Sequence, residues 1–220
     1  IYLKRNYELL LYQRYCSRAL MKDPLALFSA PWLAEQFKMQ VIVMIRHPAA
    51  FVYSVVRQGW RFDFQNLLNQ PMLVEDQLSP FKQSMEQAVS SDWSPVAEAT
   101  LLWQIAHAVI RKYEDEYPEW YFVRHEDISA DPLNYFRDLY QHLNIPFSNV
   151  ALEQIKAYSS GRAKNHTVPQ NPVNHIQRDS QSIIHNWRSG LTDEAKAYII
   201  ANTAQLAQRW YGAELAEEPY

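Results

Sequence analysis

Two short apolar runs stand out in the mixed hydrophobic pattern of this chain. Residues 41–45, VIVMI, form a continuous run rich in β-branched side chains, which is typical of a strand buried on both faces of a parallel sheet. This run ends abruptly at Arg46-His47-Pro48. Residues 120–128, WYFVRHEDI, carry the second convincing strand pattern.

Helical patterns cover much of the rest of the chain. The first predicted helix spans 1–21, and it ends before Lys22-Asp23-Pro24 because a residue that precedes proline disfavours the helical region. Thr192 is placed to cap the last helix. The predicted helices span 1–21, 31–37, a segment from Pro48, 95–113, a segment after the Asp131-Pro132 cap, and 193–210. The side chains expected to face the core are Leu101, Leu102, Ile105, Ala106 and Val109 in 95–113, and Ala197, Ile200, Ala204 and Leu206 in 193–210.

The alternation of strand and helix patterns predicts an α/β fold, with residues 1–220 as a single domain. Residues 61–94 contain two prolines and are expected to form helices and loops over the sheet. Residues 159–182 are polar and have no hydrophobic period, and loops of this length are usually mobile or functional. We therefore predict a flexible loop over 159–182 within the domain.

Composition narrows the possible partners and compartments. The chain has 220 residues, 48% of them hydrophobic, and its net charge is −3. Such a balance argues against nucleic-acid binding, so any anion site must be local. The single cysteine, Cys16, can form neither an internal disulfide nor a cysteine-rich zinc site, which favours a reducing compartment. No apolar run approaches the about 18 residues of a membrane span.

Several familiar catalytic motifs do not occur in the sequence. Only four glycines are present, and no GxxxxGK[ST] or GxGxxG phosphate-binding loop can be written. The histidines form no HExxH or HxxxH pair, so we predict no metal site. No GxSxG motif of a hydrolase occurs.

The strongest chemical signal lies at the end of the first strand. Arg46 follows the strand directly, and Ser54, eight positions later, lies about two turns into the next helix. A guanidinium at a strand end suits a phosphate group, and a hydroxyl can complete the contact. A structural arginine that caps the edge of the sheet is the alternative interpretation.

These residues carry a resemblance to a known family. The run VIVMIRHPAAFVYS resembles the 3′-phosphate-binding segment of sulfotransferases that use 3′-phosphoadenosine 5′-phosphosulfate (PAPS), in which a strand ends in Arg-x-Pro and a serine follows in the helix. Three more segments resemble that family and occur in its order: Lys22-Asp23-Pro24, FVRHEDISADPLNYFRDLYQHLNI and HNWRSGLT. The resemblance implies a P-loop-NTPase-like sulfotransferase fold, with a parallel sheet flanked by helices.

The resemblance also implies a donor site. Arg46 and Ser54 would bind the 3′-phosphate of PAPS, and Arg178 or Arg188, with Trp187, would close on it. His125 stands where many relatives have a tyrosine beside the adenine, although a histidine at a strand end is often structural. Glu126 and Asp127 are expected to point to opposite faces of the strand and to be structural rather than an acid and base pair.

Lys22 and Asp23 are the candidate catalytic residues. Sulfuryl transfer needs a base for the acceptor proton and a cation near the bridging oxygen, which would be Asp23 and Lys22 respectively. Many cytosolic relatives have a histidine near the position of Asp23, so the sequence departs from their pattern here. Alternatively, Asp23-Pro24 only initiates a turn or a helix.

The family's Lys-bearing loop for the 5′-phosphosulfate group would lie before Ile1. We therefore expect an N-terminally truncated chain that lacks the first strand and this loop, and that is inactive alone. The predicted function is PAPS-dependent sulfuryl transfer, without a metal, to a hydroxyl or amine of a small-molecule or carbohydrate acceptor. A non-catalytic nucleotide-binding or interaction domain is the alternative. The predicted location is the cytoplasm, with a luminal Golgi-type domain as the other possibility.

Overall fold

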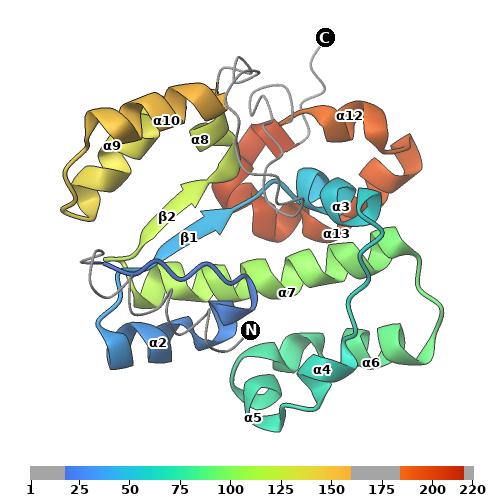
Figure 1. Ribbon diagram of the computed structural model, residues 1–220. Coiled ribbons are helices and arrows are strands. Elements are labelled where there is room, and N and C mark those ends of the chain that lie inside the picture. Colours follow the sequence, from blue (N-terminus) through green and yellow to red (C-terminus); the bar gives the residue numbers. More distant parts are fainter. Residues whose placement is uncertain (1–17, 160–183, 216–220) are drawn as a thin grey trace, which may run out of the picture.

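The computed structural model describes residues 18–159 and 184–215. At its centre, β1 (Ile42–Ile45) and β2 (Tyr121–Arg124) form a parallel sheet, the only sheet in the described part of the chain. Ile42 pairs with Tyr121 and Ile45 with Arg124, so both strands end at the same edge. Figure 1 shows α2 (Ala30–Phe37) near the start of the strands and α3 (Pro48–Arg57) beyond their carboxyl ends. The predicted parallel sheet is thus confirmed.

Both strands differ from their predictions in one respect. The second strand ends at Arg124, and His125–Ala130 form α8 instead of continuing to residue 128. Glu126 and Asp127 lie in the first turn of α8, where carboxylates interact favourably with the helix dipole. In β1 the burial alternates: Val43 and Ile45 are buried, but Met44 is 52% exposed. The expectation of a strand buried on both faces is therefore wrong.

The long helix α7 (Pro95–Glu116) lies under the sheet and packs against α3 and α13 (Asp193–Tyr211) (Figure 1). It begins as its sequence indicates, because Pro95 occupies the first turn and the Ser94 side chain accepts the N–H of Ala97. Its buried surface is wider than one stripe. The fully buried side chains include Trp103 and His107, which the predicted apolar face did not contain.

The final helix is capped as predicted, and most of its predicted inward face packs on the core. Its Thr192 cap accepts the N–H of Ala195. The side chains buried along α13 are Ile199, Thr203, Ala207 and Tyr211, whereas the predicted Ala197 is exposed. A polar residue can occupy this row because the Thr203 hydroxyl donates to the carbonyl of Ile199 at 2.7 Å. Ile200, Ala204 and Leu206 are partly buried against the core as predicted, so hydrophobicity located the inward side of α13 but missed its most buried row.

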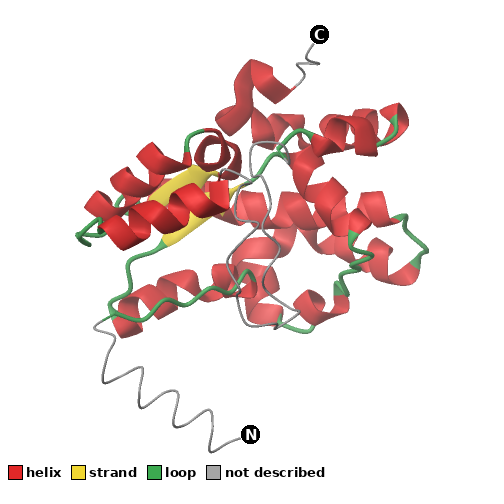
Figure 2. Ribbon diagram, turned by 45° about the horizontal axis from the view of Figure 1, so that its top comes forward, coloured by secondary structure: helices red, strands yellow, loops and turns green. Residues whose placement is uncertain are grey.

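Helices dominate the described chain around the small sheet (Figure 2). Residues 61–94 form helices and loops as predicted, but these lie on the far side of α7 from the sheet rather than over it (Figure 1). Asp131 caps α9 by accepting the N–H of Asn134. Residues 18–21 are not helical, so the helix predicted over 1–21 is too long, and the rest of it lies outside the described residues. Except for Ser159, the loop predicted over 159–182 also lies outside them. The further elements are η1 (Leu25–Ser29), α4 (Gln65–Leu68), α5 (Pro71–Leu73), a π-helical turn η2 (Val74–Leu78), η3 (Ser79–Phe81), α6 (Lys82–Ser90), α9 (Pro132–His142), α10 (Asn149–Ser159), α12 (Asn186–Gly190) and η4 (Gly212–Leu215).

The core has two parts. The larger part lies between the sheet, α7 and the helices of 64–88, and includes Val43, Ile45 and Trp103. The smaller part joins α3, α7 and α13 and includes Val52 and Ile199. Within the described ranges, no helix combines the length and the apolar character that crossing a bilayer requires.

Candidate functional site

The candidate site lies where the two parallel strands end and the next helices begin. Arg46 and His47 connect β1 to α3, and β2 runs directly into His125, the first residue of α8. The short helix α12 packs against α3, and the last turn of α13 reaches the same edge (Figure 1). In open α/β sheets, ligands bind at the carboxyl ends of the strands, so this edge is the natural place for a ligand.

Arg46 is held by its backbone from the side of α7. Its N–H donates to Nε2 of His107 at 3.4 Å, and its carbonyl accepts Nε1–H of Trp103 at 2.8 Å. Its side chain is half-buried, and its positive charge interacts electrostatically with His125. Burial, and then the positive charge of Arg46, lowers the pKa of His125 below its usual value. His125 therefore presents a neutral ring near Arg46 at pH 7.

His47 is the buried residue at the start of α3. Its backbone N–H donates to Oε1 of Glu126 at 3.0 Å, and its ring is stacked on Trp187 at 4.8 Å between centroids. Burial, and then the charges of Arg188 and Arg124, lower the pKa of His47 to about 4. Neither ring nitrogen has a hydrogen-bond partner among the described residues. The ring is thus a neutral, packed wall of the site.

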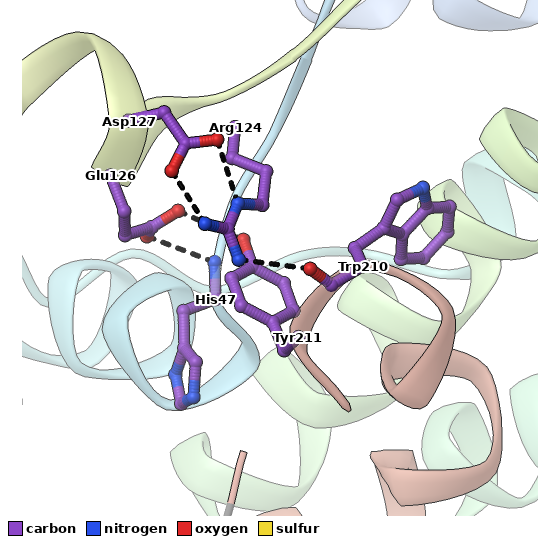
Figure 3. Close-up of polar contacts among 6 residues, drawn as sticks. All are labelled: His47, Arg124, Glu126, Asp127, Trp210 and Tyr211. Carbon is purple, nitrogen blue, oxygen red and sulfur yellow. Dashed lines mark hydrogen bonds and ion pairs between the residues drawn. The ribbon is translucent and has the colours of Figure 1, made fainter. Parts of the chain in front are cut away.

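Behind His47, an ion pair and two hydrogen bonds connect β2, α8 and α13 (Figure 3). Arg124 donates Nε–H and Nη2–H to the Asp127 carboxylate at 2.8 and 2.5 Å, and Nη1–H to the carbonyl of Trp210 at 2.9 Å. The Tyr211 hydroxyl donates to Oε2 of Glu126 at 2.9 Å. Glu126 and Asp127 therefore have separate structural partners, but they share a helical turn rather than opposite faces of a strand.

The helix α12 supplies a second arginine. Arg188 is half-buried, with its guanidinium 5.5 Å from the ring of Trp187, and its buried Nε has no hydrogen-bond partner among the described residues. Burial and the charge of Arg188 lower the pKa of His185. Gly190 lets α12 approach α3 closely, since a Cβ there would overlap the ring of Tyr53. A buried guanidinium N–H without an acceptor points to an anion that binds at this place.

The structure brings together four of the site residues expected from the sequence: Arg46, His125, Trp187 and Arg188. His47 lies among them: it follows Arg46 in the chain, its ring stacks on Trp187, and the charge of Arg188 contributes to its lowered pKa. Burial is the main cause of the lowered pKa values of His47, His125 and His185, and the charge of a nearby arginine is the second cause in each case. Charged arginines therefore lie close to neutral imidazoles at this edge of the sheet.

The remaining expected residues that the structure describes occupy α3 and the segment before η1. Ser54 is half-buried in α3, and its Oγ accepts a long hydrogen bond, 3.4 Å, from Nε2 of Gln58. Lys22 and Asp23 are exposed, and Oδ1 of Asp23 accepts the N–H of Leu25 at 2.8 Å, which forms a turn before η1. Arg178 lies outside the described residues.

Sequence reasoning missed several residues that build this site. The missed residues come from α7, β2, α13 and the β1–α3 connection, and they are His47, Trp103, His107, Arg124 and Tyr211. The only sequence signal was their position: His47 follows Arg46, and Trp103 and His107 are four apart on a predicted buried helix. Residues 18–159 and 184–215 hold no group of three or more His, Cys, Asp or Glu side chains suited to a metal ion.

Comparison with protein families gives one match. The model of a sulfotransferase domain matches residues 12–219, nearly the whole chain. No curated protein and no solved structure matches the chain significantly. The match includes both strands and every residue of the site described above.

Proposed function

Since the chain belongs to the sulfotransferase family, with the α/β fold class predicted from its sequence, we propose that it transfers a sulfuryl group from PAPS to a hydroxyl or amine of a small-molecule or carbohydrate acceptor. The observation that carries the donor site is the buried Nε of Arg188, which has no acceptor in the described part of the chain, close to the strand-end turn of Arg46. Two guanidinium groups at a strand end suit a phosphate with two or three charged oxygens.

In this proposal Arg46 and Arg188 bind the 3′-phosphate of PAPS. Ser54 completes the contact, because its oxygen accepts from Gln58 and its O–H is therefore available to donate to a phosphate oxygen. Trp187 is fixed by its stack on His47 and directs Arg188 toward the same group. Arg178 is part of the proposal on the strength of the sequence resemblance alone.

His125 contacts the adenine in the proposed complex. Burial and Arg46 keep its imidazole neutral at pH 7. A neutral ring can stack on a base or exchange a hydrogen bond with it without repelling the two arginines. The lowered pKa of His125 therefore favours donor binding, because it keeps the ring neutral beside the adenine.

The transfer itself forms a bond between the acceptor oxygen or nitrogen and sulfur, and it breaks the bond between sulfur and the oxygen of the 5′-phosphate. The acceptor proton passes to a base, for which Asp23 is our candidate, and Lys22 offsets the charge that develops on the leaving 3′,5′-diphosphoadenosine. Asp23→Asn separates this function from the turn, because an asparagine Oδ1 still accepts the N–H of Leu25. In the full-length protein, we expect turnover to fall about 10²-fold or more with donor affinity little changed. Near-normal turnover would assign Asp23 to the turn alone.

The donor site is tested by binding 3′,5′-diphosphoadenosine and 5′-AMP, which lacks the 3′-phosphate. Arg46→Ala should weaken binding of the first ligand by about 2–4 kcal/mol, since a charge-assisted phosphate contact is lost, and leave 5′-AMP binding nearly unchanged. Arg57→Ala is the matched control, because Arg57 is an exposed arginine in the last turn of α3, the helix that follows Arg46.

Equal losses for the two ligands would remove the 3′-phosphate assignment. If the full-length protein binds selectively through the 3′-phosphate but shows no acceptor-dependent release of 3′,5′-diphosphoadenosine from PAPS, a non-catalytic nucleotide-binding domain is favoured. The two measurements thus test the site and the reaction separately.

A further inference from the structure

The backbone of Arg46 is bound on both sides by side chains of α7. The Nε1–H group of Trp103 donates to the Arg46 carbonyl at 2.8 Å, and Nε2 of His107 accepts the Arg46 N–H at 3.4 Å. Trp103 is 0% exposed and His107 3% exposed. Both peptide groups that flank the Cα of Arg46 are therefore tied to the central helix rather than to the sheet.

Trp103 and His107 form one rigid unit. They lie four residues apart, one turn along α7, with their rings stacked at 4.0 Å and an interplanar angle of 15°. The Nδ1–H group of His107 donates to the Trp103 carbonyl at 2.9 Å, which leaves Nε2 as the acceptor for Arg46. Phe51 and Trp210 contact the His107 ring edge-on and enclose it.

The unit meets Arg46 at a point where the chain has left the strand ladder. The ladder ends with the pair of Ile45 and Arg124, and α3 begins at Pro48, so Arg46 belongs to neither element. Trp103 and His107 satisfy the partly buried N–H and carbonyl groups of Arg46 at this point. They thereby hold the Cα–Cβ bond from which the Arg46 side chain extends.

We infer that Trp103 and His107 are positioning residues that orient Arg46 toward the 3′-phosphate of the sulfuryl donor. The inference rests on the proposed function, because it presupposes that Arg46 contacts this phosphate. Neither side chain touches the donor. They fix the backbone from which the Arg46 side chain extends, so they determine how much of its charge-assisted contact the bound phosphate receives.

The charge state of His107 agrees with this role. Burial lowers the pKa of His107 to about 3, so its ring is neutral at pH 7 and Nε2 retains the lone pair that accepts from Arg46. The tautomer is set by the Trp103 carbonyl on the other side of the ring. Nε2 of His107 therefore remains a hydrogen-bond acceptor at neutral pH.

The test measures selectivity, the ratio of the dissociation constant of 5′-AMP to that of 3′,5′-diphosphoadenosine, by calorimetry on the full chain. Trp103→Phe keeps a ring and removes the donor, and His107→Phe keeps a ring and removes the acceptor. We expect either change to lower the selectivity about fivefold to tenfold, the effect of one lost hydrogen bond. His107→Gln, whose amide oxygen can replace Nε2, should keep selectivity within about twofold.

Tyr113→Phe is the matched control for buried ring chemistry on the same helix. Tyr113 is 1% exposed, and its hydroxyl donates to Gln77 rather than to the site. It should lower stability and leave selectivity unchanged. If His107→Phe does not fold, His107→Asn replaces it, because the shorter amide cannot reach Arg46 and should lose the selectivity that His107→Gln retains.

Two results would overturn the inference, and they differ in what else they affect. If Arg46→Ala lowers selectivity but the Trp103 and His107 variants keep it within about twofold of the parent, only the positioning role fails. If Arg46→Ala itself leaves selectivity unchanged, the proposed phosphate contact fails and the inference fails with it. In the Arg46→Ala background, Trp103→Phe should have no further effect on selectivity.

Discussion

Replacing Tyr211 with phenylalanine tests the hydrogen bond that joins the last helix to the edge of the site. The Tyr211 hydroxyl donates to Oε2 of Glu126 at 2.9 Å, and the residue is 4% exposed. The substitution removes one oxygen and keeps the ring, which lies edge-on to His47 at 5.0 Å and 5.2 Å from the guanidinium carbon of Arg124. Any loss of stability therefore reports on the hydrogen bond rather than on packing.

The expected magnitude follows from the charge of the acceptor. A buried hydrogen bond to a charged group contributes about 1.5–3 kcal/mol, so Tyr211→Phe should lower the free energy of unfolding by that amount. Tyr113→Phe provides the comparison, because its equally buried hydroxyl donates to the neutral amide oxygen of Gln77 at the longer distance of 3.3 Å. That variant should lose only about 0.5–1 kcal/mol.

Urea unfolding at pH 7.5, followed by tryptophan fluorescence, gives both losses from the transition midpoints and slopes. Alkaline pH gives a second readout. Burial, and then the negative charge of Glu126, raises the pKa of Tyr211, so above pH 10 the unfolded chain releases a proton that the folded chain keeps. Stability should therefore fall above pH 10, and less steeply in Tyr211→Phe.

Equal losses for the two tyrosine variants would contradict the reasoning. So would a loss below about 0.5 kcal/mol for Tyr211→Phe, since a charged acceptor would then contribute no more than a solvent-exposed one. An unchanged alkaline slope would show that the Tyr211 hydroxyl ionises as readily in the folded chain as in the unfolded chain.

Two further predictions concern acid stability and the packing of α12. The folded-state pKa values of His47 and His107, about 4 and about 3, lie below their usual 6.5, so the unfolded chain binds more protons as the pH falls below 6.5. The free energy of unfolding should decrease between pH 6.5 and 5 by up to about 1.4 kcal/mol per pH unit for each histidine, and a flat urea profile there would refute this. Gly190→Ala should displace α12, because its Cβ would overlap Tyr53, and weaken 3′,5′-diphosphoadenosine binding severalfold. Tyr53→Ala in the same chain should restore binding, and a double variant as weak as Gly190→Ala would count against this packing.

The sequence predicted the elements whose signals are local. A β-branched run predicts a strand, and a proline in the first turn predicts the start of a helix, from only a few neighbouring residues. The sequence therefore predicted the strand at 41–45, the turn at Arg46 and the helix from Pro48. The second strand was drawn four residues too long, because FVRHEDI continues the strand pattern. Its end depends on where Glu126 finds its donors, and these come from His47 and Tyr211, 79 and 85 residues away.

The candidate site residues also divide into those with a local sequence signal, which were predicted, and those that depend on contacts distant in the sequence, which were missed. Arg46 could be found because a charged side chain after an apolar strand is locally conspicuous. Trp103 and His107 look like core residues on a buried helix, and only the fold shows that their polar atoms meet Arg46 from 57 and 61 residues away. The inward side of α13 was predicted in part, because Ile200, Ala204 and Leu206 pack on the core. Its most buried row was missed for a related reason, since Thr203 satisfies its own hydroxyl within the helix and can be buried.

At the strand ends, the positions of a few arginines matter more for binding an anion than the net charge of the whole chain does. Arg124 forms two hydrogen bonds with the Asp127 carboxylate, so that pair adds little net charge to the site. Arg46 and Arg188 lie beside imidazoles that burial keeps neutral, and these rings can border an anion site without adding positive charge that would have to be desolvated. An acidic chain can therefore present a local phosphate site with only two arginines, provided that their backbones are fixed, as Trp103 and His107 do for Arg46.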